Sequence, residues 1–565
     1  MSVHLNIPQF ENFKDLIDSC VSFYENNQEK IKDKSVSEKR NKLSMSIEKF
    51  HIESGTLTSK VKEKIVALRQ GAPVLLMTAH QPNLLPYSGV LRKATLNFLL
   101  GKELERRLDV QVVNFFGIAD QDFTDDRWVK ASLLPAITRK DGILTLNINL
   151  PNKIILKNVH NPSINTINKW KDEIETWLHN AIYTINNIYK ENGILNWDSK
   201  KSLLHHNFDM FWEIVEEAHE RAISYSDFNA FIISKIVNEA WRYDTLFSRF
   251  SDCQKIFINE FNSLLTDFRD YSSSLKETID FLHKKDGKKG VSKEETELLP
   301  FWYHCDCGSK ARLSLNNKNE RLIGHGYCIN CKKEYNINLG KKDKPDVYNI
   351  ATKISARAIP MILIFSKGLG LTCYIGGVGG IRYLEEAKYV ANKLDITLPP
   401  VVVWRPFDKY MGIGQLESMI EYKRITGHYD INKFEEEIDH MKHRIDKIYK
   451  NITILEEKKK EIILELKKDH IDKKIFRNNL KSIIDRIGHI KKTTELSILN
   501  RDLKILENFK NVSNLMPSII DYAINIGLNE TSKQWIDFLV NNGSFSSEVL
   551  LNSFLNDLRV PKKSL

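Results

Sequence analysis

The sequence predicts a protein of the α/β class, in which helical insertions, a small cysteine-containing module and a helical hairpin are added to a parallel-sheet core. Three observations carry this prediction. Strand and helix patterns alternate along residues 74–128, four cysteines gather within residues 305–331, and a heptad pattern runs through residues 434–455. The 565 residues are too many for one hydrophobic core, so several domains are expected.

The composition, with 42% hydrophobic and 28% charged residues, is that of an ordinary globular protein. The formal net charge of +10 is small for this length, so it permits acidic ligands such as nucleotides without requiring nucleic acid, which is not expected as a partner. No apolar run is long enough to cross a bilayer, and the first residues lack a signal-peptide pattern. The seven cysteines are an odd number with four clustered, which argues against a secreted disulfide framework. We therefore expect a cytoplasmic protein without a membrane partner.

Composition and periodicity divide the chain into seven expected segments. In chain order they are an N-terminal helical segment (1–65), the first half of the sheet core (66–160), a helical connecting segment and linker (161–297), a zinc-ribbon-like module (298–345), the second half of the core (346–415), a coiled-coil helical hairpin (416–511) and a C-terminal helical segment (512–565).

The first half of the core is predicted to begin with a strand–helix–strand unit. The apolar run Val74–Met77 indicates a buried strand, and a helical period follows Pro86 and Gly89. A second apolar run, Val112–Ile118, indicates the next strand. Each strand ends in polar residues, which we name the HQPN turn (80–83) and the acidic turn (120–122). Open α/β sheets bind ligands at the carboxyl ends of their strands, so both turns are candidate site elements.

The candidate residues of this half fall into two groups. His80, Asp120 and Asp122 are the candidate catalytic residues, since at strand spacing the two carboxylates would point the same way and could share Mg²⁺ or an amine. The candidate substrate- and nucleotide-binding residues are Thr78, Gln81, Asn83, Tyr87, Lys93 and Gln121. Structural roles remain an alternative for each: a turn residue for His80, loop caps for the aspartates, and an exposed helix charge for Lys93.

Helices are expected to follow. The alternating stretch Ile143–Leu150 first predicts a half-buried strand, and residues 161–285 then repeat apolar side chains at helical spacing. The Lys- and Gly-containing stretch Leu282–Glu295 predicts a solvated linker.

Two close thiol pairs predict a structural zinc site. Cys305 and Cys307 precede Cys328 and Cys331 by about twenty residues, and four soft ligands of this kind can close a tetrahedral site. The second pair has the usual two-residue spacer, whereas the first has one residue. His304 or His325 could replace a thiol. A catalytic zinc is not expected, because four protein ligands leave no open position.

The second half of the core is predicted to contain three further strands. They are the apolar run Ile359–Phe365, the short run Leu371–Ile375 and the stretch Pro399–Trp404, which ends at Arg405. Between the second strand and a helix over 382–394 lies a glycine turn (376–380). Its backbone N–H groups could approach an anion at the helix N-terminus, although tight packing would also explain the glycines. The candidate anion-binding residues are Gly376, Gly377, Gly379, Gly380, Arg357 and Arg405.

A heptad seam predicts an antiparallel helical hairpin or coiled-coil arm. Apolar residues from Phe434 to Leu455 step by three and four, a second helix carries Ile475 to Leu506, and the polar stretch Lys467–Lys474 is the expected tip. Its Lys/Glu face is interpreted as a solvated surface, with RNA contact as the alternative.

Two motifs in this order resemble the bacillithiol-biosynthesis cysteine-adding enzyme family (BshC). They are TAHQPNLLPYSGV with the later ADQDF, and YIGGVGGIRY at residues 374–383. The resemblance implies a nucleotidylyltransferase-like, Rossmann-like core and a dimer-forming coiled coil, and hence a homodimer. The reaction assigned to the family joins cysteine to a glucosaminyl-malate acceptor.

The chain also departs from the family pattern. His80, Asn83 and Tyr87 stand where the family usually has glycines, Gln121 replaces a histidine, and Gly380 replaces a glutamate. The thiol pairs are an addition. The string HQPNLLPYSG is also similar to the start of the WbqC-like family, which makes a sugar-modifying enzyme an alternative.

The resulting hypothesis is an ATP-dependent ligase of low-molecular-weight thiol biosynthesis. It would form a carbon–nitrogen amide bond between cysteine, or a similar amino acid, and an amino sugar or other small amine, with ATP and Mg²⁺ as substrate. The alternative from another class is a non-catalytic nucleotide- or RNA-binding protein that uses the zinc module and the basic arm.

Overall fold

The computed structural model describes residues 10–189, 197–286, 292–318, 320–405, 407–467, 473–492 and 494–555. It shows a mixed α/β protein with a five-stranded parallel sheet and helical insertions. This confirms the α/β class and the parallel-sheet core that the sequence predicts. The centres of the predicted linker (287–291) and of the predicted arm tip (468–472) lie outside the described residues.

The central sheet has the strand order β12-β11-β1-β2-β5, and every neighbouring pair is parallel. In chain order the strands are β1 (Val74–His80), β2 (Val112–Ile118), β5 (Leu246–Arg249), β11 (Cys373–Ile375) and β12 (Val401–Val402). The chain therefore builds outward from β1 to one edge, returns, and builds from β11 to the other edge. The direction of winding reverses between β1 and β11, which places a crevice at the carboxyl ends of these two strands.

The strands are apolar throughout because both faces of the sheet are covered. Leu76 of β1 and Phe116 of β2 belong to one hydrophobic core, whereas Leu75 and Phe115 belong to the other. All four side chains are fully buried. Alternate residues of one strand thus face different cores. These strands therefore lack the alternating polar residues that a half-exposed strand would have.

Helices α1 to α5 precede β2 and supply part of both cores. Their bounds are Phe13–Asn26, Gln28–Ile31, Lys34–Ser54, Ser59–Arg69 and Ser88–Leu108. The long α5 connects β1 to β2, as the helical period after Pro86 predicts. The predicted strand at 143–150 is also present, since β4 (Ile143–Asn147) pairs antiparallel with β3 (Ala131–Pro135).

The segment between β4 and the cysteines is largely helical, as expected. Its main helices are α7 (Ile164–Tyr189), α8 (Trp197–Arg221), α9 (Tyr225–Lys235), α10 (Phe250–Cys253), α11 (Ile258–Thr266) and α12 (Phe268–Asp286). The edge strand β5 interrupts them and was not predicted, because its four residues follow an aromatic helical pattern without a turn signal.

The predicted strand at Ile359–Phe365 is wrong. These residues lie in α13 (Ala358–Leu369), which ends at Gly370 in a left-handed conformation with φ +58°. Apolar side chains surround the helix on nearly every side, so the sequence shows no 3.6-residue period and reads as a buried strand. The neighbouring elements follow the prediction: β11 leads into the glycine turn and α14 (Ile381–Lys393).

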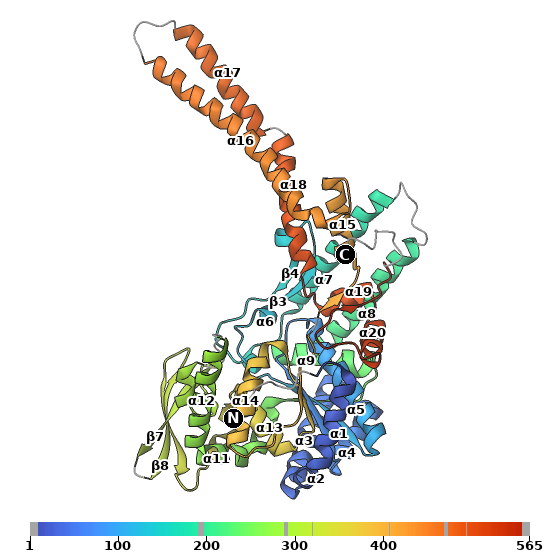
Figure 1. Cartoon of the computed structure of the whole chain (residues 1–565), viewed down its shortest axis with the longest axis vertical. Coiled ribbons are helices and arrows are strands. Elements are labelled where there is room, and N and C mark those ends of the chain that lie inside the picture. Colours follow the sequence, from blue (N-terminus) through green and yellow to red (C-terminus); the bar gives the residue numbers. More distant parts are fainter. Residues whose placement is uncertain are drawn as a thin grey trace.

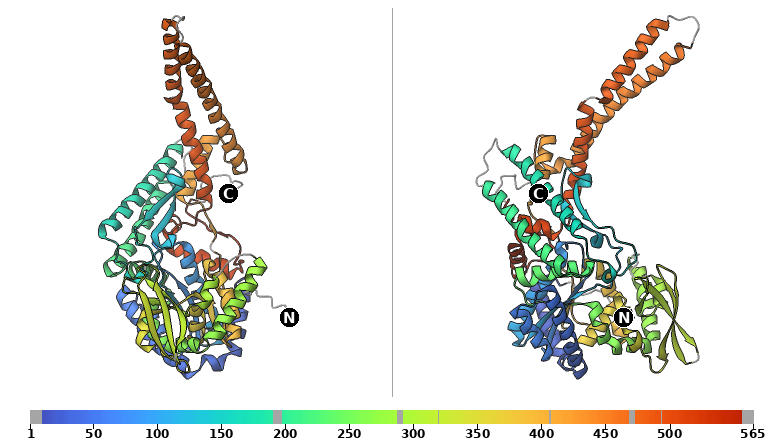
Figure 2. Two further views of the ribbon diagram at one scale, coloured as in Figure 1. Left: turned by 90° about the vertical axis from the view of Figure 1, so that its left-hand side faces the viewer. Right: turned by 180° about the vertical axis from the view of Figure 1, so that it is seen from behind.

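A second sheet has five strands, each antiparallel to its neighbours, and carries the four clustered cysteines at the ends of its strands and in the turns between them. We call it the cysteine sheet. Its order is β10-β6-β7-β8-β9, with bounds Ile354–Ala356, Phe301–His304, Lys310–Lys318, Arg321–Cys328 and Glu334–Lys341. It lies on the side of the body opposite α1 to α4, as Figures 1 and 2 show.

Helices α16 and α17 project from the body as a long arm (Figures 1 and 2). The heptad stretch lies in α16 (Phe434–Glu465), which packs on α17 (Lys473–Lys492) through Ile452, Leu455 and Ile487. The predicted second helix is two helices here, with α18 (Thr494–Ser513) leading back to the body. The remaining helices α15, α19 and α20 span Ile413–Thr426, Ile519–Asn525 and Leu528–Val540. Among the described residues, no helix combines the length and the apolar character of a membrane span.

Candidate functional site

A cavity of about 910 Å³ lies beside the carboxyl ends of β1, β2, β11 and β12. Residues from the HQPN turn, the acidic turn and the glycine turn all line it, although they are hundreds of positions apart in the chain. Eleven of the residues singled out from the sequence line it: His80, Gln81, Tyr87, Lys93, Gln121, Asp122, Gly376, Gly377, Gly379, Gly380 and Arg405. The structure therefore brings most of the candidate residues to one place.

His80 ends β1 and faces this cavity as a neutral imidazole. Its Nδ1 lies 2.9 Å from the backbone oxygen of Gln81, which can only accept, so Nδ1 carries the proton. Its Nε2 then accepts from the Tyr87 hydroxyl at 3.4 Å. Burial, followed by the nearby charge of Lys93, lowers the pKa of His80 to about 3. The ring is thus held in one tautomer and remains uncharged at neutral pH.

Lys93 connects the HQPN turn to the glycine turn. It lies in the second turn of α5, is 4% exposed, and donates from Nζ to the backbone oxygen of Ala79 at 2.8 Å. The same Nζ is 3.3 Å from the position that a Cβ on Gly377 would occupy. Burial lowers the pKa of Lys93 to about 7. The crevice between β1 and β11 therefore holds a buried amine that an anion would favour in its charged form.

Packing accounts for only part of the glycine turn. A Cβ on Gly376 would lie 2.7 Å from Leu384 Cδ1, so a larger residue there would force the Leu384 side chain to move. A Cβ on Gly379 or Gly380 would meet nothing within 4 Å, and the φ of Gly380 is an ordinary −96°. Neither backbone strain nor packing explains these two glycines, which lie at the rim of the cavity and just before α14.

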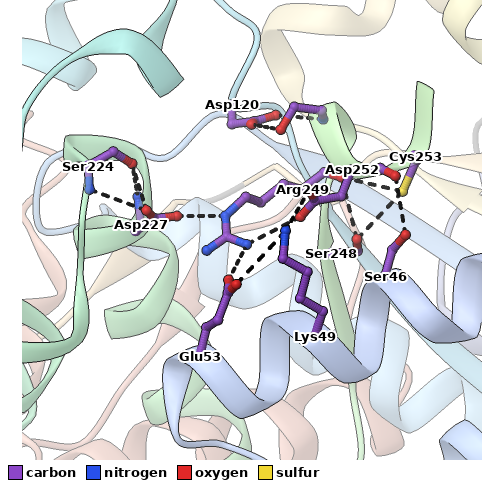
Figure 3. Close-up of polar contacts among 11 residues, drawn as sticks. Ser46, Lys49, Glu53, Asp120, Ser224, Asp227, Ser248, Arg249, Asp252 and Cys253 are labelled. Carbon is purple, nitrogen blue, oxygen red and sulfur yellow. Dashed lines mark hydrogen bonds and ion pairs between the residues drawn. The ribbon is translucent and has the colours of Figure 1, made fainter. Parts of the chain in front are cut away.

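Asp120 does not line the cavity, and this changes its expected role. Its carboxylate accepts from the Ser251 backbone N–H at 3.0 Å and from the Ser251 hydroxyl, which ties the acidic turn to α10 (Figure 3). Burial raises the pKa of Asp120 to about 6, and the Ser251 hydrogen bonds oppose the shift. The expectation that Asp120 and Asp122 point the same way is wrong, because the strand has ended and the two residues lie in a turn.

The end of β5 beside Asp120 is held by a network of ion pairs around Arg249. Arg249 Nε lies 2.6 Å from Asp227 and its Nη1 lies 2.7 Å from Glu53 (Figure 3). Both pairs join different elements, α9 and α3, to the strand. This network fixes the backbone on which Ser251 meets Asp120.

Asp122 faces the cavity instead, opposite a lysine that the sequence did not single out. The Asp122 side chain is solvent-accessible but lies inside the cavity, so the surrounding protein raises the pKa of its carboxyl while Lys310 opposes the shift. Lys310 extends from β7 of the cysteine sheet, is 4% exposed, and has its pKa lowered by burial to about 8. No motif marks Lys310, because its position depends on where the cysteine sheet packs.

Aromatic side chains form the wall around Lys310. Its Nζ lies 4.7 Å from the ring centre of Phe123 and 5.8 Å from that of Trp302. These two rings meet edge to face at 5.7 Å. Trp128, Trp404 and Tyr383 also line the cavity. Flat apolar faces with a few charged groups between them are typical of small-molecule sites.

Three other candidate residues lie away from the cavity. The Thr78 hydroxyl donates to the Ile375 backbone oxygen at 2.9 Å, which joins β1 to β11. Asn83 is buried within the HQPN turn. Arg357 is buried and pairs with Glu295, and its Cζ lies 4.0 Å from the ring centre of Trp302. The contacts of Thr78 and Arg357 are those of structural residues, whereas the buried Asn83 amide has no hydrogen-bond partner among the described residues.

The four cysteines of the cysteine sheet are close enough to bind one metal ion. Their sulfur atoms all lie within 4.8 Å of one another. Cys305 and Cys331 are 3.5 Å apart and Cys307 and Cys328 are 3.6 Å apart, near the roughly 3.8 Å edge of a tetrahedral zinc–thiolate site. His304 and His325 bond instead to Ser355 and Asn336, so the four ligands of this set are thiols.

A short loop at residues 155–157 connects the turn that carries Cys305 and Cys307 to the acidic turn. The Gly308 backbone oxygen accepts from the Ile155 N–H at 2.9 Å, and two residues further the Lys157 N–H donates to the Asp120 oxygen at 2.9 Å. Leu156 N–H donates to the Asp122 oxygen at the same distance. The loop therefore sets the position of the Lys310 wall relative to Asp122.

Comparison with known proteins adds no relative to this description. No protein-family model matches the chain, and a search of curated proteins gives no match.

Proposed function

We propose that this chain is an ATP-dependent ligase that joins cysteine, or a similar amino acid, to a small amine. The observation that carries the proposal is the meeting of the HQPN, acidic and glycine turns around one cavity, with the buried amine of Lys93 beneath the glycine turn. The resemblance to the BshC family supports the same reaction class, and an amino sugar is the acceptor it implies.

The strand order supports a nucleotide ligand. Numbered along the chain, the central sheet has the order 3-2-1-4-5, which is that of the Rossmann-like sheets that bind nucleotides where the winding reverses. In this chain that point lies between β1 and β11, beside Lys93 and the glycine turn. Backbone N–H groups before α14, the Lys93 ammonium and Arg405 would hold the phosphates.

The other cavity groups suit transfer of an activated carboxylate to an amine. ATP first converts the carboxylate to an adenylate, with loss of pyrophosphate, or to an acyl phosphate, with loss of ADP. The amine then attacks the acyl carbon, loses a proton and displaces AMP or phosphate. The neutral His80 would accept that proton, and Mg²⁺ would be bound with the ATP phosphates.

The four-cysteine site supports structural zinc, since four thiolates fill a tetrahedral shell and leave no position for substrate. In this proposal the ion stabilises the cysteine sheet and with it the Lys310 wall, and takes no part in the reaction.

The proposal is tested by incubating purified full-length protein with ATP, Mg²⁺, cysteine and glucosamine or another small amine. The expected result is ATP consumption that requires the amino acid, with an amide product detected by mass spectrometry. Exchange of pyrophosphate into ATP would report an adenylate, and ADP release would report an acyl phosphate. Absence of nucleotide binding by calorimetry would overturn the proposal. A non-catalytic RNA-binding protein would instead show affinity for RNA that falls steeply with salt.

A further inference from the structure

Two opposite charges face the cavity without partners. Lys310 is 4% exposed, and within the part of the chain that the structure describes its ammonium makes no hydrogen bond or ion pair and lies over the rings of Phe123 and Trp302. Aromatic faces attract a cation but do not replace a counter-ion. A buried cation in this position is complementary to an anion that enters the cavity.

Asp122 is the complementary group in the same cavity. Its backbone is fixed, because its oxygen accepts from Leu156 and its N–H donates to Ala119. Its carboxylate, in contrast, has no hydrogen-bond or ion-pair partner among the described residues. Asp122 and Lys310 are near enough for each charge to affect the other, yet they form no ion pair with one another. Both groups therefore line the same cavity without pairing with each other.

We propose that Asp122 and Lys310 form the binding subsite for a free α-amino acid, with Asp122 receiving its ammonium group and Lys310 its carboxylate. This inference rests on the ligase function proposed for the same cavity and identifies the residues that hold its amino-acid substrate. A zwitterion satisfies both groups at once, whereas a lone anion or cation leaves one of them unpaired.

The charge distribution separates this subsite from the phosphate region. A polyphosphate beside Lys310 would meet the Asp122 carboxylate and be repelled. The glycine turn and Lys93 instead offer N–H groups and a cation that pairs with no acid among the described residues. Lys310 would also offset the repulsion between the substrate carboxylate and ATP, because it supplies positive charge where the two anions must approach.

The subsite can be tested by removing one charge from the ligand and one from the protein. Calorimetry on the full chain would measure binding of L-cysteine, L-cysteine methyl ester and N-acetyl-L-cysteine. Wild-type protein should bind each derivative about tenfold more weakly than cysteine, since each derivative lacks one charged contact. In Lys310→Met the methyl ester should bind as tightly as cysteine, because the contact that the ester lacks has been removed from the protein. For the same reason N-acetyl-L-cysteine should bind as tightly as cysteine in Asp122→Asn.

Matched variants keep the result specific. Lys341→Met and Asp343→Asn remove exposed charges on or beside β9 of the same module and should leave all three affinities unchanged. Zinc content and thermal melting of each variant would show that the cysteine sheet is retained, and Lys310→Gln provides a second variant if Lys310→Met does not fold.

The outcomes also separate the subsite from the ligase function. Equal binding of all three ligands by wild type, or ligand preferences that survive in both variants, would overturn the subsite. If the protein consumes ATP with cysteine and the KM for cysteine is the same in Lys310→Met as in wild type, the subsite is overturned while the ligase function stands. Cysteine binding that follows the expected pattern without any ATP consumption would remove the ligase function and leave the subsite.

Discussion

Burial of Lys93 makes anion binding sensitive to pH at the level of one residue. Its pKa is about 7 in the ligand-free protein, so the charged form dominates below pH 7 and is lost above it. The affinity of wild type for a non-hydrolysable ATP analogue should therefore fall above pH 7 more steeply than that of Lys93→Met. The ratio of the two affinities should change by up to about tenfold per pH unit. Calorimetry between pH 6 and 9 measures this difference.

The comparison with Lys93→Met removes the titration of the nucleotide itself. Lys102→Met is the control, because Lys102 lies on the same helix outside the cavity and pairs with Asp244. A wild-type profile parallel to that of Lys93→Met would contradict the assignment of Lys93 to the phosphates.

Asp120 and Asp122 are predicted to differ in what they contribute. Asp122→Asn should abolish turnover, with a fall of at least about a hundredfold in kcat/KM and little change in melting temperature, because its side chain faces the cavity. Ser251→Ala should lower stability by about 1–3 kcal/mol, because it leaves the buried Asp120 carboxylate short of a donor. Steady-state kinetics and chemical denaturation measure the two effects. Wild-type turnover in Asp122→Asn would remove its proposed role.

The pKa of Asp120 also makes stability depend on pH in a definite direction. The folded-state pKa of about 6 is higher than the ordinary value of 3.8, so folding favours the protonated acid. This contribution is present at low pH and is lost as the pH rises from about 4 to 6. Asp120→Asn, which cannot ionise, should therefore gain stability relative to wild type over that range, by up to about 3 kcal/mol in denaturation experiments.

At the scale of the elements, the glycines of the glycine turn are predicted to have two different roles, Gly376 in packing and Gly380 in ligand binding. Gly376→Ala should lower the melting temperature, because its Cβ would lie 2.7 Å from Leu384. Gly380→Ala should leave the melting temperature unchanged, since a Cβ there meets nothing within 4 Å, but should weaken nucleotide binding about tenfold if phosphate lies against the turn. Unchanged nucleotide affinity in Gly380→Ala would show that the turn does not approach the ligand.

The cysteine sheet provides the second element-scale prediction. Cys331→Ser should reduce bound zinc to less than half an equivalent and lower turnover, because Lys310 and Trp302 belong to the same sheet and the loop at 155–157, which bonds to Gly308, fixes their position. Metal analysis by mass spectrometry and activity assays measure these changes. Asn330→Ser, an exposed change between two of the cysteines, should retain both zinc and activity.

These elements also show what a single sequence can and cannot predict. The strands predicted at Val74–Met77 and Val112–Ile118 and the helix between them were predictable because long patterns and punctuating turns agree. The helix at 358–369 was mistaken for a strand because a helix buried on all sides has no polar face. Lys310 was missed because its place in the cavity arises only when the cysteine sheet packs beside the acidic turn, a contact that no local pattern encodes.

At the scale of the whole molecule, the arm is the surface through which we expect two copies to associate. It carries exposed apolar side chains at Ile454, Ile463, Leu464, Ile475 and Ile484. Sedimentation at several concentrations should give about twice the 65.6 kDa mass of one chain, and Ile484→Lys should shift the protein toward the monomer. A monomer of wild type at all concentrations would contradict association through a coiled coil.

The cavity walls are drawn from almost the full length of the polypeptide, from Ala79 to Met516. During synthesis the parts near Lys93 leave the ribosome long before those that carry Lys310, Arg405 or Met516. A nascent chain consequently has no complete cavity until most of the polypeptide has been made. The same arrangement means that a single proteolytic cut with separation of the pieces, almost anywhere between these ends, would take the compartment apart.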